Sequence, residues 1–201
     1  MAPKSPVERV AALARKAGVL RPRDLGPQAI PRHYLRSAEE QGLIQRTSRG
    51  LYLPANAPLT EHHSLAEASK RVPHGVICLL SALRFHDLGT QNPFEVWLAI
   101  GNKDRAPRSE SPALRVVRFS GRALEYGQER LVLEGVPVRI TSITKTIADC
   151  FKYRNKIGLD VALEALRDCL RRKKATPSAI LKAARVSRVE NVLRPYMEAL
   201  L

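Results

Sequence analysis

The chain has 201 residues, of which 44% are hydrophobic and 26% are charged, and its formal net charge is +15. This composition supports one or two folded domains with an ordinary core and excludes a disordered chain. The strong positive charge favours a polyanionic partner, with nucleic acid ahead of an anionic membrane surface. The alternative is an arginine-rich protein of a high-GC genome, whose charge reflects codon usage.

The three cysteines, Cys78, Cys150 and Cys169, are too few and too widely spaced for a disulfide framework. They fit a reducing compartment, and we expect a cytoplasmic protein. The N-terminal sequence MAPKSPVERV lacks the apolar segment of a signal peptide. No apolar run approaches the roughly 18 residues that a membrane span needs, so we expect no membrane contact.

The N-terminal segment predicts two short helices. Ser5-Pro6-Val7-Glu8 is a capping box, with Ser as the N-cap, Pro in the first turn and Glu at the third helical position. Apolar residues follow at helical spacing up to Gly18, where the helix should end. Pro22 suits the start of a second helix, which should end at Leu25-Gly26.

The segment from Ile30 to Pro54 predicts a helix that is followed at once by a hairpin. Pro31 suits the first helical turn, and Gly42 suits a left-handed residue at the end of the helix. Short strands are expected on both sides of the turn Thr47-Ser48-Arg49-Gly50. A helix with a basic-tipped hairpin behind it is the recognition helix and wing of a winged helix-turn-helix.

Leu35 and Ala38 should lie on the buried face of this helix, which leaves polar side chains free to contact DNA. DNA binding requires cationic groups at phosphates and a few polar groups at base edges. We expect the helix to lie in the major groove and the wing to hold the flanking backbone or minor groove. The alternative is a winged helix that contacts only protein. The candidate DNA-binding residues are Arg32, His33, Tyr34, Arg36 and Ser37 on the helix and Arg46, Thr47, Ser48 and Arg49 on the wing.

Residues 54–58 form a predicted linker, and the pattern then changes to a second domain. Helices are expected from Thr60 to Arg71 and from Val76 to Leu88. A small antiparallel or mixed sheet with a polar loop and a helical C-terminal region should follow. The expected sheet segments are strands over 94–100 and 114–119, the loop 101–112 and a hairpin over 131–140, and the expected helices begin near Ser142, Leu159, Thr176 and Val189.

These elements predict an α+β fold with two domains. The first, residues 1–56, is a winged helix-turn-helix DNA-binding domain, and the second, residues 59–201, is an α+β domain with a small sheet and a helical end.

Metal binding and catalysis have little support in the sequence. The spacing of His62, His63, His74 and Cys78 matches no common metal motif, so we expect no metal and no cofactor. The acids Glu95, Asp104 and Glu110, with Lys103 and Lys145, lack the ordered spacing of a nuclease, and Cys150 lacks a histidine partner. We therefore expect that the chain is not an enzyme. The basic run 171–174 either complements a helix dipole or makes a second anionic contact.

Four segments, taken in order, carry a resemblance to a known family. They are Gly42-Leu43-Ile44 to Arg49-Gly50-Leu51-Tyr52, Ser81-Ala82-Leu83, Glu95 to Ile100, and Val138 to Gly158 with Thr141, Lys145-Thr146, Asp149-Cys150-Phe151 and Lys156-Ile157-Gly158. In this order they resemble the AbiEi antitoxins of type IV, abortive-infection toxin–antitoxin systems, which serve in phage defence.

The resemblance implies a transcriptional repressor that binds inverted repeats of double-stranded DNA in its own promoter. It also implies a nucleotidyltransferase-like toxin as the functional partner, opposed without a stable complex. Paired half-sites require two winged helices, from a weak dimer or from monomers that load cooperatively. The alternatives are a winged helix with a nuclease-like C-terminal domain and an antitoxin that binds its toxin directly.

Overall fold

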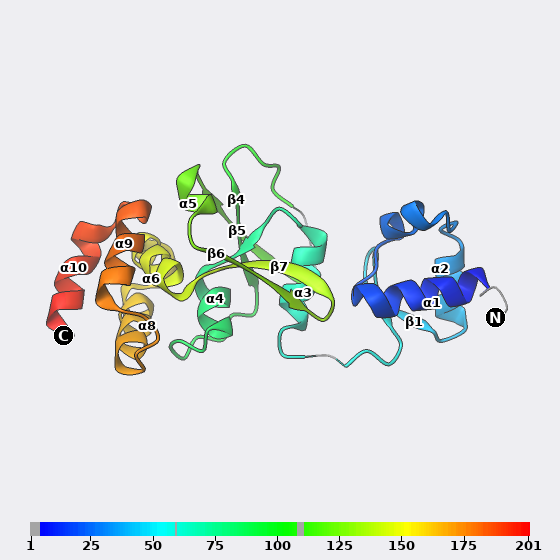
Figure 1. Ribbon diagram of the computed structural model, residues 1–201, viewed down its shortest axis with the longest axis horizontal. Coiled ribbons are helices and arrows are strands. Elements are labelled where there is room, and N and C mark those ends of the chain that lie inside the picture. Colours follow the sequence, from blue (N-terminus) through cyan, green and yellow to red (C-terminus); the bar gives the residue numbers. More distant parts are fainter. Residues whose placement is uncertain (1–4, 59, 108–110) are drawn as a thin grey trace. The chain divides into compact units, whose positions relative to one another are not determined.

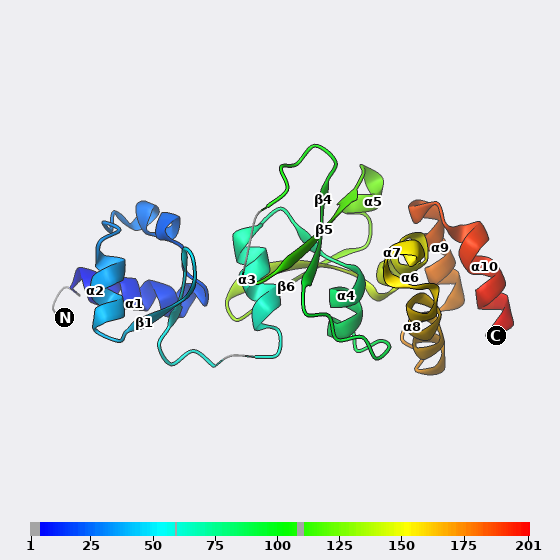
Figure 2. The ribbon, with the colours of Figure 1, turned by 180° about the vertical axis from the view of Figure 1, so that it is seen from behind.

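The computed structural model describes residues 5–58, 60–107 and 111–201 and has the predicted α+β fold (Figures 1 and 2). Its internal contacts divide the chain into two compact units. The first contains Met1–Arg71 and Val132–Pro137, and the second contains Val72–Leu131 and Val138–Leu201. Within the described part of the chain, none of the helices has the length and apolar character that a membrane crossing requires.

The first unit contains a winged helix-turn-helix and one further helix. Its elements are α1 (Pro6–Ala17), the 3-10 helix η1 (Pro22–Gln28), α2 (Tyr34–Glu40), β1 (Ile44–Ser48), β2 (Leu51–Pro54) and α3 (His63–Arg71). The predicted capping box begins α1, since Ser5 Oγ accepts from the Glu8 amide at 3.2 Å and Glu8 Oε2 accepts from the Ser5 amide at 2.8 Å. The left-handed Gly18 follows the helix.

An apolar core joins α1, η1, α2 and β1. The β1–β2 hairpin is joined to it by a bridge in which the Leu20 amide donates to the Tyr52 carbonyl at 2.8 Å and the Tyr52 amide donates to the Leu20 carbonyl at 2.9 Å. The buried members of this core are Val10, Ala14, Leu20, Leu25, Ile30, Leu35, Ala38 and Ile44.

The recognition helix begins later than predicted. It starts at Tyr34 and not near Ile30 as predicted, and Arg32 and His33 lie in the turn before it. This turn has the tighter i to i−3 pattern, because the Tyr34 amide donates to the Pro31 carbonyl and the Leu35 amide donates to the Arg32 carbonyl. The helix ends at Glu40, and the left-handed Gly42 comes two residues later.

The second unit is built around a mixed sheet. Among the described residues the sheet has five strands in the order β5-β4-β3-β7-β6. The pair β3–β4 is antiparallel, whereas β3–β7 and β4–β5 are parallel. The hairpin β6–β7 contributes its turn to the first unit and the rest of its strands largely to the second. The strands are β3 (Val76–Ile77), β4 (Val96–Gly101), β5 (Leu114–Phe119), β6 (Gln128–Leu133) and β7 (Val136–Thr141).

The prediction of one helix from Val76 to Leu88 is wrong. The segment begins with the short strand β3, and α4 (Leu79–Phe85) follows it. Cys78 has extended backbone dihedrals and Leu79 has a positive φ of 48°, so the chain turns sharply between the two elements. The β-branched pair Val76-Ile77 fits a fully buried strand, and an apolar run of this kind does not distinguish a strand from a buried helix by its periodicity.

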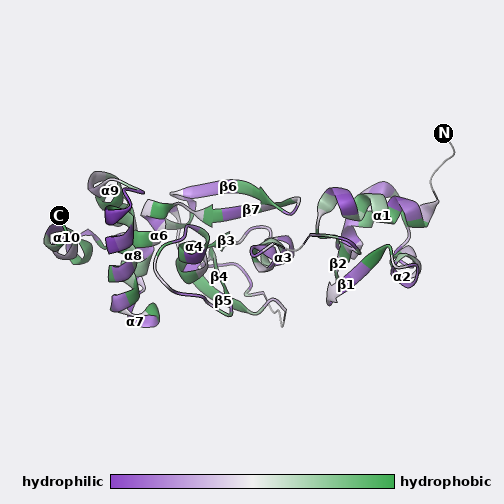
Figure 3. Cartoon of the chain, turned by 90° about the horizontal axis from the view of Figure 1, so that it is seen from below, coloured by the Kyte–Doolittle hydropathy of each residue, from purple (hydrophilic) through white to green (hydrophobic). Residues whose placement is uncertain are grey.

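Helices form the C-terminal part of this unit and gather at one end of the sheet (Figures 1 and 2). Both α6 and α8 carry hydrophobic and hydrophilic residues along their lengths (Figure 3), as amphipathic helices do. Ser142 and Thr176 cap α6 and α9 as predicted, and α10 contains Pro195. The C-terminal helices are α6 (Ile143–Lys152), α7 (Arg154–Ile157), α8 (Leu159–Arg171), α9 (Pro177–Ser187) and α10 (Glu190–Ala199), and the short helix α5 (Arg122–Glu125) comes earlier, between β5 and β6.

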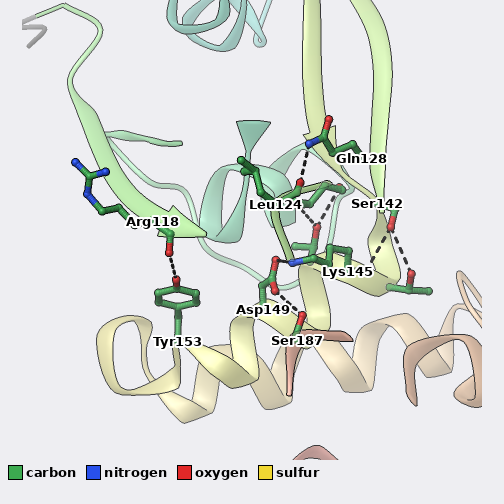
Figure 4. A network of polar contacts seen from close by, with 11 residues as sticks. Arg118, Leu124, Gln128, Ser142, Lys145, Asp149, Tyr153 and Ser187 are labelled. Atoms are coloured by element: carbon green, nitrogen blue, oxygen red, sulfur yellow. Dashed lines mark hydrogen bonds and ion pairs between the residues drawn. The ribbon is translucent and has the colours of Figure 1, made fainter. Parts of the chain in front are cut away.

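A buried ion pair lies between the sheet and these helices (Figure 4). Lys145 and Asp149 are one turn apart on α6, their side chains are 0% and 1% exposed, and they form a direct ion pair. Ser187 of α9 donates to the second oxygen of Asp149 at 2.9 Å, and the Lys145 ammonium lies 4.5 Å from the ring centre of Phe119. Burial lowers the pKa of Lys145 and raises that of Asp149, so the pair must offset the desolvation of both charges.

We predict that Lys145→Met reduces the free energy of unfolding of the second unit by about 3–5 kcal/mol, because it leaves the Asp149 charge buried without its cation. Urea unfolding followed by the fluorescence of Trp97 measures this loss. The control Lys152→Met removes an exposed lysine of the same helix and should change little. Wild-type stability of Lys145→Met would contradict the prediction, and Lys145→Met with Asp149→Leu should recover part of the loss.

Candidate nucleic-acid interface

The packing of α2 fixes which of its side chains reach solvent. Leu35 and Ala38 are buried, as predicted, at 4% and 0% exposure. Arg36 on the opposite side of α2 is exposed, as are Arg32 and His33 in the turn before the helix. Tyr34 and Ser37, which were also predicted to contact DNA, are half-buried at the border between the two faces.

Arg36 is held along the helix by a neighbouring acid. Its Nε donates to Glu40 Oε1 at 2.8 Å, and both side chains are well exposed. The Glu40 hydrogen bond raises the pKa of Arg36. An exposed pair at i and i+4 is weak and exchanges its partners readily, so Arg36 can leave Glu40 for a phosphate or a guanine.

The wing divides the predicted residues into two groups. Arg46 and Arg49 are exposed, and Arg46 Nε makes a local hydrogen bond to the Ser48 carbonyl at 3.4 Å. Thr47 is also exposed and Ser48 is half-buried. The Thr47 hydroxyl donates to Glu67 of α3, and the Ser48 hydroxyl accepts from Arg71 at 2.8 Å. The cations of the wing are thus available to DNA, while its hydroxyl groups are hydrogen-bonded within the unit.

The far side of α3 is tied to η1. Asp24 Oδ2 lies 2.9 Å from Lys70 Nζ and accepts from the Arg21 amide at 2.9 Å, and the Arg21 guanidinium donates to the Lys70 carbonyl. Partial burial raises the pKa of Asp24, but hydrogen bonds and charges from Lys70 and Arg21 outweigh it and leave the pKa lowered. The contacts of α3 thus group it with the winged helix, although we had predicted a domain border between residues 56 and 59.

The start of α3 contacts the turn of the β6–β7 hairpin. Glu134 accepts from the Thr60 amide at 2.8 Å, from the Thr60 hydroxyl at 2.7 Å and from His63 Nδ1 at 2.6 Å. The backbone carbonyl oxygen of Glu134 would lie 1.4 Å from a Cβ atom placed on Gly18, so only glycine fits at position 18. Burial raises the pKa of Glu134, but the His63 and Thr60 hydrogen bonds outweigh it and lower the pKa.

The structure describes all the residues considered for metal binding or catalysis except Glu110. Among the residues that the structure describes, no group of three His, Cys, Asp or Glu side chains is placed to hold a metal ion. Lys145 and Asp149 are buried against each other, and burial raises the pKa of Cys150, which suits an inert thiol. Asp104 accepts from the Gly101 amide at 2.8 Å within its own loop, and Glu110 lies outside the described residues.

The basic run after α8 mainly joins that helix to the end of α4. Arg172 pairs with Asp87, and Lys174 donates to the carbonyls of His86 and Asp87. Arg171 pairs with Asp168 of its own helix at 2.7 Å. These contacts hold Arg172 and Lys174 within the unit through His86 and Asp87, which neither the helix-dipole role nor the second anionic contact predicts.

The sequence did not predict the part that α3 takes in this unit. Glu67, Lys70 and Arg71 are ordinary residues for a solvated helix, and their partners lie some twenty to fifty positions away in the chain. The only local signal was the basic pair Lys70-Arg71 at the end of the helix. Pairings over this distance do not follow from spacing.

A comparison with protein-family models matches residues 8–55 to a family described as transcriptional regulator, AbiEi antitoxin. The matched segment covers most of α1 and all of η1, α2 and the wing, and it confirms the family resemblance for this part of the chain. Among solved structures, the RV2827C protein from Mycobacterium tuberculosis matches with a TM-score of 0.52 and 13% identity, over 97% of this chain and 81% of that chain. At this identity the likeness concerns the fold alone. A comparison with curated proteins gave no match.

We predict that Asp24→Asn lowers the free energy of unfolding at pH 7 by up to about 1 kcal/mol, since it removes the partly exposed pair with Lys70. The pKa of Asp24 is lowered from its ordinary 3.8. The contribution of Asp24 to the free energy of unfolding is therefore complete above pH 3.8, and it is lost as the pH falls through the lowered pKa of the folded state. Urea unfolding by circular dichroism at pH 7 and at the lowest pH that the fold tolerates should show the difference shrinking in acid. A difference that grows in acid, or equals that of the exposed-acid control Glu39→Gln, would refute the assignment.

Proposed function

We propose that the chain is a DNA-binding antitoxin that represses its own operon. The observation that carries the proposal is the cationic surface of α2 and the wing, formed by Arg32, Arg36, Arg46 and Arg49, in a segment that matches regulators of the AbiEi antitoxin family. The net charge of +15 supports it, because a strongly cationic protein attracts DNA over long range.

In this proposal α2 lies in the major groove and presents its N-terminal end to base edges. Arg32 and His33, in the turn before α2, and Arg36, in its first turn, are the groups placed there. An arginine fork at guanine O6 and N7 is the commonest specific contact of this kind. Arg46 and Arg49 hold phosphates or the minor groove beside the site.

The finer parts of the proposal follow the family resemblance. The operator is a pair of inverted repeats in the protein's own promoter, bound by a weak dimer or by cooperative monomers. The opposed toxin is nucleotidyltransferase-like, in a type IV system of phage defence, and a stable complex with it is not required. The protein acts in the cytoplasm, and the proposal assigns no catalytic step to the chain.

We predict that Arg36→Ala weakens binding to the upstream DNA about ten- to a hundredfold and relaxes sequence preference, since a bidentate base contact is lost. Fluorescence anisotropy with labelled duplexes measures both effects. The control Glu40→Gln removes the same intrahelical pair but keeps the arginine, so its affinity should equal or exceed that of the wild type. Equal losses in both variants would mean that the ion pair, and not a DNA contact, carries the effect.

We further predict that Arg49→Ala weakens binding to specific and scrambled DNA alike, because a phosphate contact carries no sequence information. The slope of log affinity against log salt concentration should become less steep by about 1. The matched control Lys182→Ala removes an exposed cation of α9 and should leave the slope unchanged. An unchanged slope for Arg49→Ala would contradict the phosphate contact that we assign to Arg49 of the wing.

A further inference from the structure

The wing is a small hairpin that needs support from outside itself. A two-stranded hairpin alone is at best marginally stable in water. One strand, β2, is supported by the backbone bridge between Tyr52 and Leu20. The other strand, β1, has β2 as its strand partner, and its register shifts between Arg46 and Ser48. This irregular end of β1 leads directly into the turn that carries Arg49.

Helix α3 contacts this end of β1 with two charged side chains. Glu67 accepts a hydrogen bond from the Thr47 hydroxyl. Arg71 donates through one guanidinium nitrogen to the Ser48 hydroxyl at 2.8 Å and through the other to the Arg49 carbonyl at 3.4 Å. The planar fork of arginine makes both contacts at once, whereas a lysine ammonium is a single point of charge.

Glu67 is itself fixed in place. It is only 4% exposed, and a buried carboxylate requires partners. Besides Thr47, its Oε1 lies 3.5 Å from His63 Nε2, and the other ring nitrogen of His63 lies 2.6 Å from Glu134. A continuous set of polar contacts thus runs from Glu134 through His63 and Glu67 to the wing, and it restricts where the Glu67 carboxylate can lie.

We infer that Glu67 and Arg71 are positioning residues for the wing, and we call the pair the wing clamp. The clamp fixes residues 47–49, so that the neighbouring cations Arg46 and Arg49 point into solvent in one arrangement. It reduces the conformational freedom that the wing would otherwise lose on binding. The effect on DNA affinity rests on the proposed function, whereas the effect on wing mobility does not.

The first test measures the mobility of the wing without DNA. Trypsin cleaves after Arg46 and Arg49 only when the wing opens, and for fast opening the rate follows the open population. We expect Arg71→Met to raise the initial cleavage rate at these two bonds about five- to tenfold, as the loss of charge-assisted hydrogen bonds implies. The full chain is digested in its native state, and mass spectrometry of the products identifies the cleaved bonds. The matched control Lys70→Met removes the adjacent cation, which pairs with Asp24. It should raise the cleavage rate at the wing much less than Arg71→Met does.

Two further variants separate positioning from general loss of structure. Glu67→Gln keeps the size of the side chain and an acceptor for Thr47, so it should fold and raise the cleavage rate less than Arg71→Met. Arg71→Lys should restore only part of the protection, because it cannot make both contacts. Wild-type cleavage rates in Arg71→Met and Glu67→Gln would overturn the clamp, and so would equal acceleration by Lys70→Met.

The second test uses the protein's own upstream DNA in a double-mutant cycle. If the clamp positions Arg49 to contact the DNA phosphates, Arg71→Met should weaken DNA binding. Arg49→Ala should then reduce the affinity much less in the Arg71→Met background than in the wild type. Full additivity of the two losses would overturn the positioning role in DNA binding. Absence of specific binding by the wild type would defeat the proposed function instead, and the cleavage rates would still decide the clamp.

Discussion

The burial of Leu35 and Ala38 determines which side of α2 can meet a ligand. Both residues are held in the core of the first unit together with Ile44 of the wing. The shared core fixes α2 against the base of the hairpin at Ile44, whereas the tip that carries Arg49 is held by contacts with α3. The apolar contacts thus orient Arg36 on α2, and the cations themselves contribute little to the stability of the fold.

Buried charges in both units mark the places where elements far apart in the chain are joined. Glu67 joins α3 to the wing, and the Lys145–Asp149 pair with Ser187 joins α6 to α9. Such groups are costly to bury without partners, so each one strongly disfavours other arrangements of its neighbours. In the first unit these contacts join α3 to the winged helix, and the residues of α3 that contact the wing lie outside the segment matched by the family model.

The local features of the fold were predictable from the sequence, and the long-range pairings were not. The capping box at Ser5, the left-handed Gly42 and the strands of the wing depend on neighbouring residues and were predicted correctly. The strand at Val76 was mistaken for helix because its burial depends on β4 and β7 on either side. The DNA contacts of Thr47 and Ser48 stay a prediction, and nothing near them in the sequence indicates that their hydroxyl groups also bind Glu67 and Arg71.

The most direct test of the account is the affinity of the full chain for its own upstream DNA, compared with a scrambled duplex of equal length and composition across a series of salt concentrations. The account predicts tight binding to the upstream duplex, much weaker binding to the scrambled one, and a steep loss of affinity with salt as counterions compete for the phosphates. Equal and weak binding to both duplexes would contradict it, because the cationic surface of α2 and the wing would then have no specific target.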